Sequence, residues 1–155
     1  MLSDKGKLSG TTIDLLTSFA PRLNTSFAPL VPLYLDPIIK LLGRPNKVFI
    51  RRAEHCLGEI IANCPVVSII YELKKGLEND APTCRRGCAA AMVKAVQQWS
   101  IEVWGEKGVR WLEDGIRRMG GDKDAEVRAT GKVMWGLFAE QWPERVDEWV
   151  GVDFP

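Results

Sequence analysis

Apolar residues recur every three or four positions in three separate stretches of the chain. This spacing places them on one face of an α-helix, because the helix repeats every ~3.6 residues. Each stretch therefore predicts a helix of about four turns that is buried along one side. The three apolar faces are Phe49, Ala53, Leu57, Ile60 and Cys64; Cys84, Cys88, Ala91, Ala95 and Trp99; and Val127, Gly131, Met134, Phe138 and Trp142. Sustained alternation of apolar and polar residues is absent, so the sequence predicts an all-α fold.

A further helix is predicted before each of these three, over residues 30–42, 66–77 and 106–119. Each is followed by a short polar segment with glycine or proline, at residues 43–46, 78–82 and 120–124. Glycine after a helix end and proline near a helix start are the usual punctuation of a helical hairpin. Residues 12–20 (TIDLLTSFA) predict the second helix of a preceding pair.

The starts of the second helices align with one another. Cys84-Arg85 corresponds to Val127-Arg128 and, more loosely, to Phe49-Ile50, which gives offsets of 35 and 43 residues. These offsets bracket the ~40 residues of a HEAT-type helical hairpin, which buries its apolar faces by stacking on its neighbours. We therefore expect an α-solenoid of about three full HEAT-like repeats plus a partial one. A closed four-helix bundle is the alternative architecture.

Length and composition fit one soluble domain. The chain has 155 residues, of which 46% are hydrophobic and 26% are charged, which is enough to bury a real core. We expect the helical array to span residues 12–155 and residues 1–11 to form a flexible N-terminal segment.

The net charge argues against two classes of partner, nucleic acids and anionic membranes. With 21 basic against 20 acidic residues, the chain has no general attraction for nucleic acid or an anionic membrane. No apolar run approaches the ~18 residues of a membrane span, and the N-terminal segment MLSDKGKLSG is polar. The four cysteines lie in helical apolar patterns, as buried reduced thiols do, which predicts a cytosolic protein.

Basic residues cluster at the loops and at the starts of the second helices. Arg85 and Arg86 follow the buried Cys84 and are rotated from it by about 100° and 200°, so they flank the apolar face. Positive charge at a helix N-terminus is unfavourable by about 0.3–1 kcal/mol per exposed residue. Its recurrence in a stacked array indicates a row of cations for an acidic partner. The alternative is that an arginine here, Arg128 above all, bonds an aspartate such as Asp80 or Asp124.

Three segments resemble the second half of a TOG domain of the CLASP (cytoplasmic linker-associated protein) family. They are Asn46-Lys47-Val48-Phe49; Cys84-Arg85-Arg86-Gly87-Cys88 followed by Gln98-Trp99; and Asp122-Lys123-Asp124-Ala125-Glu126-Val127-Arg128 followed by Met134-Trp135-Gly136. The likeness runs from about residue 13 to residue 149. The aromatic anchor that the family places in its first intra-repeat loop has no counterpart in this chain.

This resemblance implies a stack of HEAT repeats whose intra-repeat loops lie against αβ-tubulin. It implies proteins of the cytoplasm and cytoskeleton that stabilise microtubules, promote rescue and act at the mitotic spindle, the kinetochore and the cell cortex. Tubulin's acidic surface supplies the charge that complements the loops. The candidate tubulin-binding residues are Arg44, Lys47, Arg51, Arg85, Arg86, Lys123, Arg128 and Lys132.

Catalytic and metal chemistry find little support in the sequence. His55 is the only histidine, no serine or cysteine lies in a nucleophile motif, and no Cys-x-x-Cys pair is present. We therefore expect a binding module that is not an enzyme and needs no cofactor or metal. The alternative function is a docking scaffold that binds a non-tubulin partner, such as a kinetochore or plus-end factor, through its concave face or its acidic end. In that case Trp142 and Trp149 would matter more than the arginines.

Overall fold

The structure is a computed structural model that describes residues 10–149, and the regular elements in this range are all helical. In chain order, with η for 3-10 helices, they are α1 (Gly10–Leu23), η1 (Asn24–Leu30), α2 (Val31–Leu42), α3 (Lys47–Asn63), α4 (Ser68–Gly76), α5 (Pro82–Gln98), η2 (Ile101–Val103), α6 (Gly105–Gly120), α7 (Ala125–Gln141), α8 (Pro143–Val146) and η3 (Asp147–Trp149). The all-α prediction is confirmed for this part of the chain.

The predicted hairpins correspond to α2–α3, α4–α5 and α6–α7. The bounds of the first helices differ from the expected ones by no more than two residues; α4, for example, begins at Ser68 where residue 66 is expected. Helix α1 begins at Gly10, so residues 10 and 11 are helical where a flexible segment is predicted. Residues 1–9 and 150–155, including the rest of that segment, lie outside the described range.

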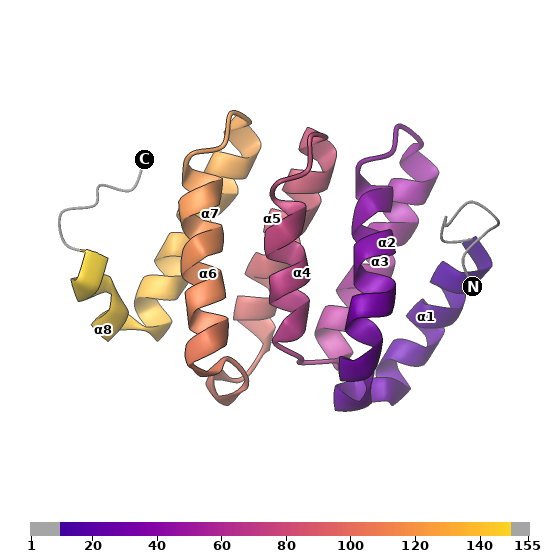
Figure 1. Cartoon of the computed structure of the whole chain (residues 1–155), viewed down its shortest axis with the longest axis horizontal. Helices are drawn as coiled ribbons and strands as arrows, with labels where there is room; N and C mark the ends of the chain where they lie inside the picture. The colour runs from indigo at the N-terminus through magenta and orange to yellow at the C-terminus, as the bar shows by residue number, and fades with distance from the viewer. Residues whose placement is uncertain (1–9, 150–155) are drawn as a thin grey trace.

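The helices form two layers that run side by side along the molecule (Figure 1). The first helices α2, α4 and α6 pack in one layer, and the second helices α1, α3, α5 and α7 pack in the other. Helix α1 lies against α3, which is the position predicted for the second helix of a partial repeat. The layers extend from repeat to repeat without closing, so the expected solenoid is confirmed and the four-helix bundle alternative is wrong.

The three predicted apolar faces form the core between the layers. Every residue of the second and third faces is buried, and so are Ala53, Leu57, Ile60 and Cys64 of the first face. Phe49 is the exception, because it lies in the first turn of α3 and is only partly covered. The helical period therefore identifies the inner side of each second helix.

Helices α4 and α5 approach closely at Gly76. A Cβ added at this position would collide with the Cys88 sulfur on α5 and with Ile39 on α2. The absence of a side chain at Gly76 thus lets the two helices of the second repeat pack tightly.

The C-terminal end of the solenoid is covered by α8 and η3. Arg145 on α8 bonds both oxygens of Glu113 on α6, at 2.9 and 3.0 Å. The Trp149 ring lies 5.0 Å from that of Trp135, with Arg117 4.2 Å from its centroid, and Trp149 is 7% exposed. Trp142 is equally buried, so both tryptophans pack inside this end of the solenoid.

One stretch has the length and hydropathy of a membrane span. Residues Gly10–Leu42 form a continuous helical run of 33 residues, which contains an 18-residue apolar window with a mean hydropathy of 1.2, whereas the sequence analysis expects no such stretch. The run contains the turn η1, which begins at Asn24 with a positive φ of 46°, and α1 and α2 lie in different layers on either side of it. Of the apolar window, 44% is buried within the fold. The stretch therefore consists of two helices in different layers of the solenoid, joined by η1.

Candidate functional site

The three loops that join first to second helices lie along one edge of the solenoid, at the top of Figure 1. They comprise residues 43–46, 77–81 and 121–124, and we call this row the loop edge. The loops between repeats lie at the opposite edge. The alignment that the sequence predicts for the basic helix starts is therefore present in the fold.

Side-chain hydrogen bonds fix the shape of these loops. Asn46 caps α3 by accepting from the Val48 amide at 2.9 Å, and Asp124 caps α7 by accepting from the amides of residues 126 and 127. Asn79 and Asp122 occupy equivalent positions and accept from the amide two residues later, at 2.9 and 2.8 Å. These bonds satisfy amides that the helix starts leave unpaired.

The Arg85 guanidinium is hydrogen-bonded at the junction between the second and third repeats. Its Nε and Nη2 donate to the two carboxylate oxygens of Asp122, at 2.8 and 3.2 Å. Its Nη1 donates to the backbone carbonyls of Asn79 and Asp80, both at 2.9 Å. Its side chain is only 7% exposed. The prediction that Arg85 points toward a partner is therefore wrong, because its donors are bonded inside the protein.

Arg86 makes a second link across the same junction but keeps contact with solvent. It donates to both oxygens of Asp124, at 3.1 and 2.6 Å, and Glu126 lies 3.2 Å away. These bonds from Arg86, helped by the amides at the start of α7, lower the pKa of Asp124. The Arg86 side chain is 41% exposed, so it stays in contact with solvent.

Arg128 occupies the position equivalent to Arg85 in the next repeat. Its Nη1 donates to the backbone carbonyl of Asp122 at 2.7 Å, six residues earlier, as Arg85 does to Asn79. The expected bond to an aspartate carboxylate is thus replaced by one to a loop carbonyl. Arg128 holds the third loop against its own helix.

The other candidate cations form no ion pair with an acid of residues 10–149. Lys47 and Arg51 are exposed and lie one turn apart at the start of α3, with the partly exposed Arg44 in the loop before them. Lys123 is exposed in the third loop. Lys132 is also exposed but lies about 10 Å along α7 from its start, from a rise of ~1.5 Å per residue.

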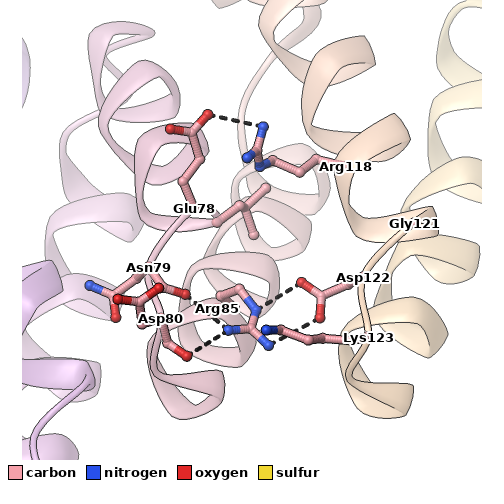
Figure 2. A pocket seen from close by; sticks show the side chains of 9 residues that line it. Glu78, Asn79, Asp80, Arg85, Arg118, Gly121, Asp122 and Lys123 are labelled. Carbon is pink, nitrogen blue, oxygen red and sulfur yellow. Dashed lines mark hydrogen bonds and ion pairs between the residues drawn. The ribbon is translucent and has the colours of Figure 1, made fainter.

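The sequence analysis missed Arg118, which the fold brings to the loop edge. This residue lies in the last turn of α6, and its Nη1 lies 2.9 Å from Glu78 in the second loop. Figure 2 shows the pair beside an open hollow of about 340 Å³ between the second and third loops. Basic residues in the last turn of a helix are common, so the sequence carried no distinct signal for this one.

The four cysteines are buried and free of disulfides, as the sequence analysis expects. Burial raises the pKa of Cys56 and of Cys64. The pKa of Cys88 is raised mainly by its hydrogen bond with Cys84 and, to a smaller extent, by burial. Since the thiolate is the nucleophile and the metal ligand, protonated thiols suit a packing role. Among residues 10–149, no group of three or more metal-ligating side chains is arranged to hold a metal ion.

The chain is similar to a known protein family and to a plant protein. A family model described as CLASP N terminal matches residues 1–150. A CLIP-associated protein from Arabidopsis thaliana is 24% identical over 132 residues, which cover 84% of this chain and 9% of that protein. The chain therefore spans a small part of the length of this relative. That the chain corresponds to the later repeats of a TOG domain stays a prediction.

Proposed function

The chain belongs to the CLASP N-terminal family, and we propose that it binds the acidic surface of αβ-tubulin through the free cations of its loop edge. Family membership supports a microtubule-associated, cytoskeletal role. The observation that carries the finer proposal is that three exposed cations at or next to the loop edge form no ion pair with an acid of residues 10–149. They are Lys123 in the third loop, and Lys47 and Arg51 in the first turns of α3, directly after the first loop. No reaction, cofactor or metal is part of the proposal.

The proposal centres on the first and third loops. Arg85 and Arg128 donate hydrogen bonds to carbonyls of the loops, and Arg86 forms an ion pair with Asp124. Lys47 and Arg51 keep their full charge and lie one helical turn apart, so one acidic segment of tubulin can contact both. We further propose that this contact serves microtubule stabilisation and rescue, with action at the mitotic spindle and the kinetochore.

The test is co-sedimentation of the whole chain with stabilised microtubules. We expect the Lys47→Glu/Arg51→Glu variant to lose affinity by about tenfold or more, because two attractive contacts become repulsive. Binding by the unmodified chain is expected to weaken as salt rises, since exposed charge pairs are screened over ~8 Å at physiological ionic strength. Thermal melting of the variant should match that of the unmodified chain, because both positions are exposed.

The matched control is Arg22→Glu/Lys107→Glu. Both residues are exposed and carry the same charge, but they lie at the end of α1 and the start of α6, at the edge opposite the loops. We expect this control to bind almost as well as the unmodified chain. Equal losses in both double variants, or no binding of the unmodified chain at low salt, would contradict the proposal.

A further inference from the structure

Two hollows on the surface meet at the ion pair between Glu78 and Arg118. The first hollow, of about 340 Å³, lies between the second and third loops (Figure 2). The second, of about 440 Å³, runs along α4 and α6 and is lined also by Lys74, Asp114 and Arg117. Glu78 and Arg118 line both hollows. A group that approaches the loop edge between these repeats therefore reaches this pair from either side.

The pair is held much more weakly than the two arginine–aspartate links beside it. Glu78 and Arg118 make a single approach of 2.9 Å, and their side chains are 58% and 48% exposed. Arg85, in contrast, is bonded to both oxygens of Asp122, with each side chain 7% exposed. An exposed pair contributes little stability, whereas breaking a buried one leaves an unpaired charge. Arg118 can therefore change partners at low cost.

The wall of the hollow formed by α6 and the third loop is cationic. Arg118 extends from the last turn of α6 toward the hollow, and Lys123 lines the same hollow from the third loop (Figure 2). Lys123 has no ion pair with an acid of the described residues. Asp122, on the same wall, is already neutralised by Arg85. Arg118, held by one exposed ion pair, and Lys123 can therefore attract a carboxylate, and the exposed Asp80 on the facing second loop opposes this attraction.

We propose that Arg118 is a further contact residue for tubulin and that Glu78 is its internal competitor. On binding, a carboxylate of the partner takes the place of Glu78 on the Arg118 guanidinium, and the Glu78 side chain turns to solvent. One ion pair is lost and one is formed, and Lys123 adds attraction that Glu78 does not use. This inference rests on the proposed function and assigns part of the same surface.

The test compares microtubule co-sedimentation of the whole chain with that of its Glu78→Gln variant. Gln keeps the size of the side chain and removes the charge that competes for Arg118. We expect binding to tighten by roughly two- to fivefold, the scale of an exposed ion pair. We expect Arg118→Ala to weaken binding and to abolish the gain from Glu78→Gln when the two changes are combined, because the gain acts through Arg118.

The matched control is Asp36→Asn, which also removes one negative charge from an exposed ion pair, with Lys40 at 2.7 Å on α2. We expect no change in its binding, so a gain in both variants would point to net charge alone and overturn the inference. The inference is also overturned if Glu78→Gln binds no better than the unmodified chain, or if its gain persists with Arg118→Ala. In those cases binding by the unmodified chain leaves the proposed function standing. Absence of binding by both proteins at low salt overturns the two together.

Discussion

Arg85 and Asp122 join the second and third repeats by two hydrogen bonds, of 2.8 and 3.2 Å, between residues 37 positions apart in the chain. Both side chains are 7% exposed. The same guanidinium also bonds the carbonyls of its own loop at residues 79 and 80. A residue that the sequence offers as a contact for a partner is thus a structural clamp between repeats.

Removing one member of this clamp should destabilise the fold strongly. Because the other charge is left buried, we expect Arg85→Ala or Asp122→Ala to lower the free energy of unfolding by about 3–5 kcal/mol. Replacing both by apolar residues, as in Arg85→Met/Asp122→Leu, should cost less than either single change. Urea unfolding followed by circular dichroism measures this, and a double variant as unstable as the sum of the singles would contradict it.

Asp124 should contribute to acid sensitivity. The bonds from Arg86 lower its folded-state pKa, so the unfolded chain binds this proton more tightly than the folded one. The stabilisation is complete above the unfolded-state pKa of about 3.9 and is lost as the pH falls below it toward the folded-state value.

We therefore expect the Asp124→Asn variant to lose less thermal stability than the unmodified chain between pH 5 and pH 2.5. Asp80→Asn is the control, because Asp80 is exposed and its carboxylate forms no ion pair with the described residues. Parallel melting curves for the unmodified chain and Asp124→Asn over this range would count against the role of Asp124.

The cover at the C-terminal end should stabilise α7. Trp149 is buried against Trp135 and Phe138, with Arg117 over its ring. We expect Trp149→Ala to cost about 3 kcal/mol, near the lower end for a buried tryptophan. Hydrogen exchange should rise mainly in the second half of α7 and in α8, while α2 and α3 keep their protection. A uniform increase along the chain would argue against a local cover.

Gly76 should tolerate no side chain while Cys88 is present. We expect Gly76→Ala to destabilise the fold by about 1–3 kcal/mol, because the added methyl group meets the Cys88 sulfur and Ile39. In a Cys88→Ala background the same change should cost measurably less, since one of the two obstacles is gone. The measurement is the denaturant midpoint of the unmodified chain, of each single variant and of the double variant. If Gly76→Ala lowers stability by the same amount with and without Cys88→Ala, the contact between residues 76 and 88 is excluded.

Local pattern was sufficient for most of the fold. The period of apolar residues identified the inner faces of α3, α5 and α7, with only Phe49 less covered than expected. Glycine and proline placed the loops, and the offsets of 35 and 43 residues revealed stacked hairpins. These features are readable in a single sequence because a helix and its ends depend on residues within a few positions of each other.

Which cations face outward was decided only by the tertiary structure. Arg85 and Lys47 are both basic residues at the start of a second helix, yet one is clamped by Asp122 and the other is exposed. Arg118 reaches Glu78 only because α6 stacks beside α4. An ion pair depends on distances of a few ångströms between segments about 40 residues apart, and the stacking of repeats sets these distances.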